Sequence, residues 1–322
     1  MVRPTASSVF AALLALASIA ASGQEIYPVK PVRLVVATPG SPQDIVARIV
    51  SPRLAELWKQ AVTVENRSGA GSLMSIQTIV KAAPDGYSIL IASSSYAVTP
   101  ALYPEARFDA DKDLVPIALL AVSPIVIVGA PSLNPLSLQD LIERSRKGEK
   151  LQFGSPGHGT APALLLEYLM KVLAKVDILH VPYKGVVAPM TATSIGEVAI
   201  AGSGIASAMP FIKSGKVKPL ALASATRWSG LPDVPTLAEA GFTGLEDQQW
   251  IGVWVPAKTP ASLVDRLTED FGRAVRDADV VTRLSGVGYE IGMMKRDAFA
   301  AYVRAEVTKW ARIAKETGAK AE

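Results

Sequence analysis

Short runs of β-branched and other apolar residues alternate along the chain with longer segments in which apolar residues recur at helical spacing. The runs that predict strands are residues 32–37, 62–65, 88–92, 124–128, 151–154, 178–181, 217–223 and 250–255. Strands that alternate with helices are typical of parallel sheets whose faces are covered by crossover helices. The pattern therefore predicts an α/β protein with parallel sheets.

Three helices have clear starting points in this pattern. The first is expected to have Ser41 as its N-cap, because Pro42 follows at the first helical position and Asp44 stands three residues after the cap. A second helix is expected to begin near Thr160, and the residues that follow would give this helix a wide apolar face. The last helix is bounded at its start by Asp297 and carries apolar residues on one side only. We therefore expect the last helix to pack one face on a core.

The chain is too long for one ordinary core. Its 322 residues suit two α/β lobes of about 100 to 200 residues each. The crossing between the lobes is expected where a strand continues without an intervening helix, at residues 115–128, and the return near residues 248–255. We therefore predict a discontinuous first domain of residues 24–123 plus 248–322 and a second domain of residues 124–247.

The first 23 residues have the pattern of a secretory leader. Arg3 precedes an apolar run of about 13 residues, which ends in small residues near Ser22 and Gly23. Spanning a bilayer takes about 20 apolar residues, so this run is too short for a membrane anchor. Residues 1–23 are therefore predicted to be a signal peptide, and the mature protein is expected in an outer bacterial compartment.

Composition narrows the classes of function. The chain is 49% hydrophobic and 19% charged, which is the balance of a packed globular protein. The net charge is +4, but the basic residues are scattered and form no run that would indicate a nucleic-acid surface. Cysteine is absent and the only histidines are His158 and His180, so neither thiolate chemistry nor a histidine-rich metal site is expected.

No catalytic motif stands out in the sequence. No serine lies in a G-x-S-x-G elbow, no P-loop pattern occurs, and Gly202-Ser203-Gly204 lacks the third glycine of a dinucleotide fingerprint. A serine could be combined with His158 and an aspartate, but no spacing selects one. We therefore expect no enzymatic activity, no cofactor and no metal, and we keep a hydrolase as an alternative.

Four loops rich in small residues, hydroxyls and free backbone amides each follow a predicted strand. They are residues 38–41, 93–96, 154–160 and 202–204. In open α/β sheets the ligand crevice lies outside the carboxyl ends of the strands. The first and third loops also lead into helix N-termini, where unpaired N–H groups attract an anion without a basic side chain. Two such helix ends facing each other across a cleft would suit a molecule with two acidic groups.

Several residues in and near these loops also have an ordinary structural interpretation. Glycine and serine after a strand are common turn and capping residues. Asp44 suits a helix cap better than a ligand contact, and His158 is either a cleft residue or a solvated loop residue. Lys184 follows a predicted strand, where it either supplies a counter-charge or is simply exposed.

Four longer motifs occur in a characteristic order. They are Val64-Glu65-Asn66-Arg67-Ser68-Gly69-Ala70-Gly71, Ala83-Pro84-Asp85-Gly86-Tyr87, Val181-Pro182-Tyr183-Lys184-Gly185 and Leu231-Pro232-Asp233-Val234-Pro235-Thr236-Leu237-Ala238-Glu239-Ala240-Gly241. With these motifs the chain resembles the Bug-type receptors of tripartite tricarboxylate transporters, over nearly all of its mature length. The resemblance implies a two-lobed type II periplasmic binding protein fold, in which a hinge joins two α/β domains around a central ligand cleft.

The resemblance also implies a function. A protein of this kind would be a periplasmic, monomeric receptor that captures a small organic anion, a mono- or dicarboxylate, and delivers it to permease subunits in the cytoplasmic membrane. The first strand-to-helix loop would hold the carboxylate through backbone amides and hydroxyl groups. A receptor that presents its ligand to a membrane signalling partner remains an alternative.

The loops and the resemblance together give the predicted ligand-binding residues. They are Thr38, Pro39, Gly40, Ser41, Asp44, Ser93, Ser94, Tyr96, Ser155, Gly157, His158, Gly159, Thr160, Lys184 and Ser203. The chain departs from the family pattern at four positions: Ser41 replaces a glycine, Ala163 a histidine, and Ala199 and Ser203 replace aspartates. Because a cleft that loses acidic groups favours anionic or less polar ligands, an aromatic or aliphatic carboxylate is expected rather than a sugar or a metal.

Overall fold

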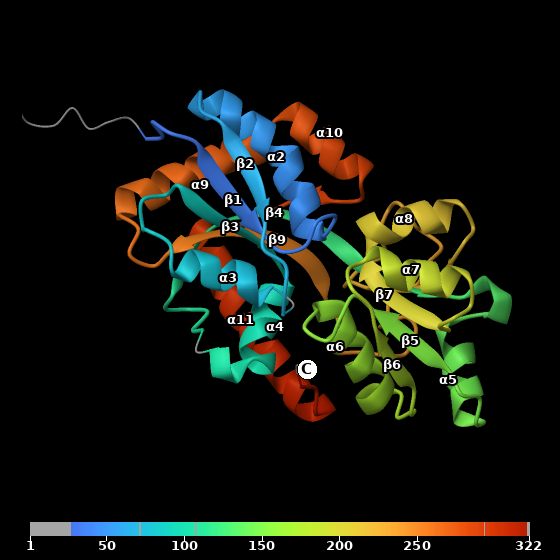
Figure 1. The fold of residues 1–322 in the computed structure, drawn as a ribbon. Coiled ribbons are helices and arrows are strands. Elements are labelled where there is room, and N and C mark those ends of the chain that lie inside the picture. The colour runs from blue at the N-terminus through green and yellow to red at the C-terminus, as the bar shows by residue number, and fades with distance from the viewer. Residues whose placement is uncertain (1–26, 71, 107, 293, 321–322) are drawn as a thin grey trace, which may run out of the picture.

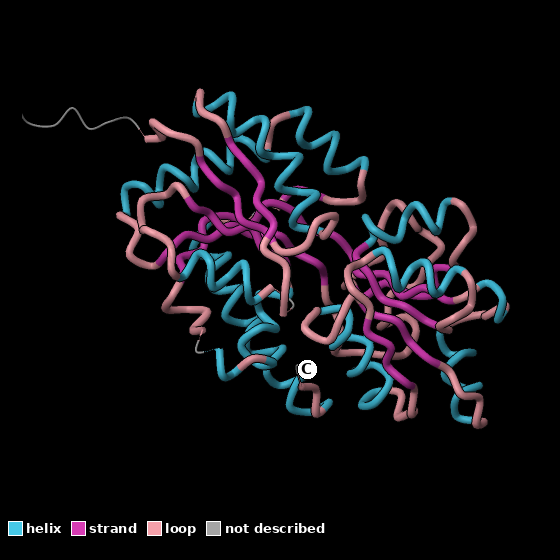
Figure 2. The backbone as a smooth tube through the Cα atoms, in the orientation of Figure 1, coloured by secondary structure: helices cyan, strands magenta, loops and turns pink. Residues whose placement is uncertain are grey.

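A computed structural model describes residues 27–70, 72–106, 108–292 and 294–320. The predicted signal peptide, residues 1–23, lies outside the described residues. The described chain forms two α/β lobes that lie side by side (Figure 1), each with strands at its centre and helices on both sides (Figure 2). Within the described residues, no helix has both the length and the apolar character needed to span a membrane.

The first lobe is built on three parallel strands. Strand β1 (Val32–Val36) lies between β2 (Val62–Asn66) and β3 (Ser88–Ser93). The helices of this lobe are α2 (Pro42–Trp58), α3 (Leu73–Val80), α4 (Ser95–Leu102), α9 (Ala261–Val275), α10 (Ala278–Gly286) and α11 (Arg296–Thr317), with the short η2 (Pro104–Ala106). Apolar side chains on both faces of β1 are buried. Leu34 belongs to an apolar cluster with residues of α2, α9 and α10, and Val35 belongs to a second cluster with residues of α3, α4 and α11. The sheet is therefore covered on both faces.

Two strands connect the lobes. Strand β4 (Leu114–Gly129) is 16 residues long, and its first part pairs antiparallel with β9 (Gln248–Pro256) in the first lobe. From Ile125 onward β4 pairs instead with strands of the second lobe. The predicted crossing at residues 115–128 falls within this one strand. The domain limits of 24–123 plus 248–322 and 124–247 stay a prediction.

The second lobe repeats the layered arrangement. Its strands β5 (Gln152–Ser155), β6 (Leu179–Pro182) and β7 (Ile200–Gly204) are parallel, and β7 and β8 (Lys218–Ala223) pair with β4. Its helices are η3 (Pro131–Leu133), α5 (Leu138–Arg146), α6 (Ala161–Glu167), the π-helical η4 (Tyr168–Leu173), α7 (Val187–Ser194) and α8 (Ile205–Lys213). The strand order is β2-β1-β3-β9-β4-β7-β5-β6, and β10 (Glu290–Ile291) pairs with β4.

The structure corrects the predicted sheet type. Each lobe has the expected parallel strands, but β4 and β9 make the sheet mixed, since β9 pairs antiparallel with both β3 and β4. The sequence predicts the return near residues 248–255. The alternation of strands and helices does not reveal, however, that β9 returns without a crossover helix and so runs antiparallel to its neighbours. The predicted helix starts are confirmed at Ser41 and Thr160, which are the N-caps of α2 and α6, and the last helix begins one residue before Asp297.

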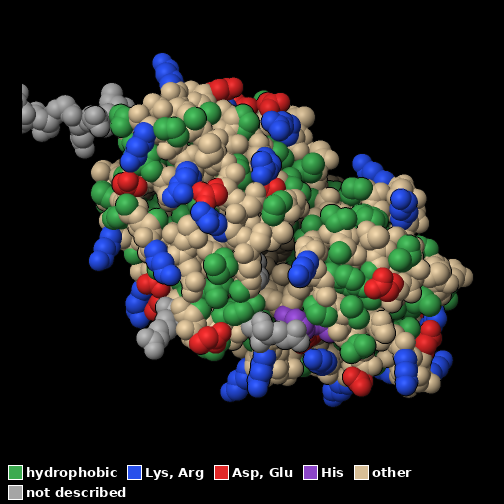
Figure 3. Space-filling view, viewed as in Figure 1, with side chains coloured by type: hydrophobic (Ala, Val, Ile, Leu, Met, Phe, Trp, Pro, Cys, Tyr) green, Lys and Arg blue, Asp and Glu red, His purple; other side chains and the backbone are tan. Residues whose placement is uncertain are grey.

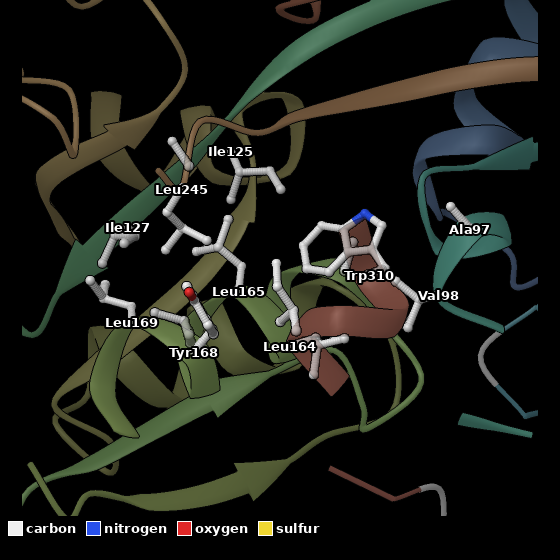
Figure 4. Packing of buried hydrophobic residues seen from close by; sticks show 14 of the residues in the cluster. Ala97, Val98, Ile125, Ile127, Leu164, Leu165, Tyr168, Leu169, Leu245 and Trp310 are labelled. Atoms are coloured by element: carbon white, nitrogen blue, oxygen red, sulfur yellow. The ribbon is translucent and has the colours of Figure 1, made fainter. Parts of the chain in front are cut away.

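The C-terminal helix packs on both lobes. Trp310 of α11 is fully buried and belongs to the same apolar cluster as Val98 of α4 and Leu164 of α6 (Figure 4). Two residues further along, Arg312 Nη1 donates a hydrogen bond of 3.2 Å to the hydroxyl of Tyr168 in the second lobe. One continuous apolar cluster therefore spans the two lobes.

A buried ion cluster ties α11 to the start of β9. Lys309 Nζ lies 2.8 Å from Asp247 Oδ1 and 2.7 Å from Glu306 Oε1. Glu306 Oε2 accepts hydrogen bonds from the indole N–H groups of Trp250, at 3.3 Å, and Trp310, at 3.2 Å. Burial raises the pKa of Asp247 to about 7; Lys309 opposes the shift and repulsion by Glu306 adds to it. The Lys309 ammonium therefore forms ion pairs with both the Asp247 and the Glu306 carboxylates.

Replacing Asp247 by asparagine should remove a pH-dependent part of the stability. The pKa of Asp247 is about 7 in the folded protein against an ordinary value of 3.8, so the folded state binds this proton more tightly than the unfolded chain. The free energy of unfolding therefore falls as pH rises from about 4 to about 7, the range in which the folded state holds this proton and the unfolded chain has lost it, and it levels off above that range. We expect urea unfolding to show this decrease between pH 4.5 and 7 in the wild type and much less of it in Asp247→Asn. The exposed Asp233→Asn is the control, and a decrease of wild-type size in Asp247→Asn would contradict the assignment.

Candidate ligand-binding site

A cavity of about 600 Å³ lies between the lobes, and the surface is visibly hollowed there (Figure 3). From the first lobe it is lined by Thr38, Ser41, Pro42, Gln43, Ser68, Gly69, Ala70, Ser72, Ser93, Ser95 and Tyr103. From the second lobe and β9 it is lined by Pro156, Gly157, His158, Gly159, Thr160, Pro162, Pro182, Tyr183, Lys184, Gly185, Val186 and Gln249. Most of these residues follow the carboxyl ends of β1, β2, β3, β5 and β6, which is where ligands bind to open α/β sheets.

The loop between β1 and α2 is held by one carboxylate. Gly40 has a φ of +70°, a left-handed conformation that suits glycine, and its amide donates a 2.9 Å hydrogen bond to Asp44 Oδ2. Asp44 Oδ1 also accepts a 2.9 Å hydrogen bond from Asn66 Nδ2, and Arg48 forms an ion pair with the same carboxylate. Burial opposes ionisation of Asp44, but these hydrogen bonds outweigh it and lower its pKa. Asp44 therefore fixes the loop that precedes α2, and it is not among the residues that line the cavity.

The start of α2 presents polar groups to the cavity. Ser41 is the N-cap, and Pro42 at the first helical position has no N–H, so the first available helix amides are those of the next two residues. Ser41 Oγ and Gln43 Oε1, and Ser72 Oγ at the N-cap of α3, are buried and have no hydrogen-bond partner among the described residues. The two hydroxyls can donate, whereas Gln43 Oε1 only accepts. Buried polar atoms are normally paired, so this part of the lining is suited to a ligand that pairs with them.

The second lobe contributes a loop supported from below by a hydrogen-bonded array. Ser155 Oγ lies 2.6 Å from His180 Nε2, and His180 Nδ1 lies 3.0 Å from Glu167 Oε1. The amide of Gly157 donates a 3.2 Å hydrogen bond to Ser155 Oγ. Ser155 is fully buried and does not line the cavity, whereas residues 156–160 do.

The array of Ser155, His180 and Glu167 has the residue types of a hydrolase triad and also those of a metal site. The order serine, histidine, glutamate is that of a hydrolase triad, but a nucleophile must reach its substrate, and Ser155 is turned into the protein. Ligand atoms of His158, Glu167 and His180 also lie within 4.8 Å of one another, a spacing that could hold a metal ion. However, Lys171 Nζ lies 3.2 Å from Glu167 Oε2 and already supplies a positive charge there. The hydrogen bonds thus account for the array without catalysis or a metal.

The charges around the cavity favour an anion. Among the described lining residues there is no aspartate or glutamate, and Lys184 is the single lysine or arginine. Lys184 is exposed, and no hydrogen bond or ion pair joins it to another described residue. Glu197 lies nearby but accepts a 2.7 Å hydrogen bond from the hydroxyl of Tyr183. The N-terminus of α2 and the Lys184 ammonium therefore dominate the local field.

The predicted site residues divide into three groups. Those that line the cavity are Thr38, Ser41, Ser93, Gly157, His158, Gly159, Thr160 and Lys184. Pro39 and Gly40 are exposed beside it and Asp44 is turned toward the backbone. Those buried elsewhere are Ser94, Tyr96, Ser155 and Ser203.

The residues buried elsewhere have structural partners or positions. The ring of Tyr96 stacks on Trp254 with centroids 4.4 Å apart, and its hydroxyl donates a 2.9 Å hydrogen bond to the Ala110 carbonyl. Ser94 is the N-cap of α4. Ser203 lies inside β7, so residues 202–204 are strand and not the predicted loop. With Ser155, these side chains do not line the cavity.

Sequence reasoning missed several lining residues. Ser68, Gly69, Ala70 and Ser72 follow β2, which is parallel to β1, so the carboxyl-end rule that selected the other loops would have found them. Gln43 gave no comparable signal, because a glutamine in the first turn of a helix is usually a surface residue.

Comparison with known proteins places the chain in a family. Residues 46–319 match the family described as the tripartite tricarboxylate transporter family receptor. The chain is 31% identical to protein BugT of Bordetella pertussis, over 97% of each chain. It is 33% identical to a protein encoded in the tcbD-tcbE intergenic region of Pseudomonas sp. strain P51, over 90% of this chain and 87% of that protein.

Solved structures have the same fold. A protein of R. palustris solved with adipate is 29% identical with a TM-score of 0.85, covering 92% of this chain and all of that chain (100%). MatC of Rhodopseudomonas palustris, solved with bound malate, is 29% identical with a TM-score of 0.83, covering 89% of this chain and 99% of that one. The periplasmic binding protein BugD is 29% identical with a TM-score of 0.83, covering 92% and 100%. The chain has their two-lobed fold and belongs to the tripartite tricarboxylate transporter family of receptors.

Proposed function

We propose that this protein is a receptor that captures a small organic carboxylate in the cavity between its lobes and performs no chemistry on it. The observation that carries the proposal is a pair of buried, unpartnered serine hydroxyls that line the cavity at two helix N-termini, Ser41 at the N-cap of α2 and Ser72 at the N-cap of α3. Helix amides and serine hydroxyls can donate, and such donors suit carboxylate oxygens.

The ligand is proposed to be a mono- or dicarboxylate without an ammonium group. No acidic side chain among the described lining residues could pair with an ammonium. Lys184 lies on the lobe opposite α2 and could meet a second carboxylate. The adipate and malate held by the two relatives have the corresponding pair of acidic groups. The predicted ligand-binding residues that line the cavity are proposed to make these contacts.

The cellular role follows from the family. We propose that residues 1–23 direct export, that the mature monomer works in the periplasm, and that it hands its ligand to the permease subunits of a tripartite transporter. The family description and the periplasmic relatives support this role.

A panel of organic acids should identify the ligand class. A ligand present at 100 times its dissociation constant stabilises the folded state by about 2.7 kcal/mol, which is visible as a higher melting temperature. We expect at least one mono-, di- or tricarboxylate to raise the melting temperature, and the matching neutral amide to leave it unchanged. A panel in which no acid acts would remove the main support for the proposal.

Substituting Ser41 by alanine should weaken carboxylate binding without lowering stability. The Ser41 hydroxyl has no partner among the described residues, so its loss costs the folded protein no hydrogen bond, whereas hydrogen bonds to charged groups contribute about 1.5–3 kcal/mol. We expect isothermal titration to show roughly a tenfold or larger loss of affinity. Ser94→Ala is the matched control, because Ser94 Oγ is equally buried and unpartnered but lies outside the cavity. Equal carboxylate affinities in the two variants would exclude the α2 N-terminus as the binding site of the carboxylate.

Substituting Lys184 by methionine should reduce the affinity for a dicarboxylate more than for a monocarboxylate of the same chain length. The change removes the single basic side chain among the described lining residues and keeps a similar stem. The control is Lys213→Met, at the end of α8 and outside the cavity. An unchanged ratio of the two affinities in Lys184→Met would show that this ammonium does not meet a second acidic group.

A further inference from the structure

The array of Glu167, His180 and Ser155 lies beneath the second-lobe side of the cavity, and its last hydrogen bond reaches the Gly157 amide of the cavity loop. The three residues come from α6, β6 and β5, so the fold brings them together from separate elements. The side chains of Glu167 and His180 are each 8% exposed. The following inference rests on the proposed function, since it concerns how the cavity loop is held.

The direction of each hydrogen bond in the array follows from its acceptors. Burial opposes ionisation of Glu167, but the hydrogen bond from His180 and the charge of Lys171 lower its pKa, so Glu167 is a carboxylate and only accepts. His180 Nδ1 must then carry a proton, and in the neutral ring Nε2 accepts from the Ser155 hydroxyl. Ser155 Oγ in turn accepts from the Gly157 amide. The four groups form one directed chain.

Packing fixes the ring in this orientation. The His180 ring lies flat on Phe153, with centroids 4.5 Å apart and planes at 5°. The ring of His158 meets its edge, with centroids 4.7 Å apart. A flip of the imidazole would break both the hydrogen bond to Glu167 and the hydrogen bond to Ser155. These two hydrogen bonds and the ring contacts therefore hold the ring in one orientation.

The far end of the chain determines the shape of the loop. Gly157 has a φ of +129°, a conformation that its hydrogen bond to Ser155 Oγ holds. The Gly157 carbonyl accepts from both the amide of Thr160, at 3.2 Å, and its hydroxyl, at 2.7 Å. Gly157, Gly159 and Thr160 all line the cavity.

We propose that Glu167 and His180 are positioning residues, which hold Ser155 and, through it, the loop of residues 156–160 in the conformation that binds a carboxylate. Neither residue lines the cavity. Their effect is transmitted through two hydrogen bonds, one that the Ser155 hydroxyl donates to His180 Nε2 and one that the Gly157 amide donates to Ser155 Oγ.

The test that needs no ligand uses NMR on the whole protein. We expect ¹⁵N shifts to show the Nδ1–H tautomer of His180, and the Gly157 amide to exchange slowly. Glu167→Gln keeps an acceptor for Nδ1 and should keep both signatures, whereas Glu167→Ala should lose them and speed Gly157 exchange at least tenfold. Lys171→Met removes only the ion pair with Glu167 and should behave as wild type. If Glu167→Ala does not fold, Ser155→Ala takes its place for the exchange measurement.

The binding test uses adipate and malate in isothermal titration. We expect Glu167→Ala or Ser155→Ala to lower the affinity about tenfold, and Glu167→Gln and Lys171→Met to stay within about threefold of wild type. Loss of affinity with rescue by glutamine separates positioning from a general loss of stability.

Three results would overturn the inference. They are an Nε2–H tautomer in the wild type, Gly157 exchange unchanged in the alanine variants, or a loosened loop with unchanged acid affinity. Tight zinc binding that Glu167→Ala abolishes would also overturn it, because the array would then be a metal site. If the wild type binds neither acid nor any other in the panel, the proposed function fails, and the tautomer and exchange data still decide whether the array holds the loop.

Discussion

The antiparallel pairing of β4 with β9 is the constraint on which the two-lobed structure depends. Because β9 is antiparallel to both β3 and β4, β3 and β4 point in the same direction, toward the second lobe. Since β7 is antiparallel to β4, the parallel strands of the second lobe point back toward the first. The carboxyl ends of both sets of strands therefore meet at one place. That place is the cavity, and its lining of strand-end loops is a consequence of strand direction alone.

This geometry explains how the cavity can suit an anion while containing so few charges. The α2 N-terminus is directed into it by the loop after β1, and the carboxylate of Asp44 is used to fix that loop and not to face the ligand. On the opposite side Glu167 is likewise engaged behind the loop, by His180 and Lys171. Asp44 and Glu167 thus stabilise the walls of the cavity, and the polar groups of its described lining are amides, hydroxyls, His158 and one lysine.

Local signals in the sequence were sufficient for the elements and for part of the site. N-caps at Ser41 and Thr160 depend on neighbouring residues only, and the loops after β1 and β5 follow from strand ends, so both could be predicted. The mixed sheet could not be predicted: the sequence indicates the return near residues 248–255, but no local signal gives the direction in which β9 pairs with β3 and β4. Tyr96 follows a strand as expected, but the stacking surface that draws it into the core is Trp254, far away in sequence. The Ser155 to Glu167 array was missed for the same reason: its members are brought together only by the folded second lobe.

The helix α11 has a consequence for how far the lobes can separate. It contributes Trp310 to an apolar cluster that includes residues of both lobes. A wide separation of the lobes would therefore expose the apolar surface of this cluster to water. Exposing each 100 Å² of apolar surface costs about 2.5 kcal/mol, roughly four times the thermal energy. In the empty receptor the two lobes should accordingly move apart by only a small amount. Binding of a solute would then require little reorganisation of the polypeptide. A cavity that is preformed in this way loses little conformational freedom when a ligand binds.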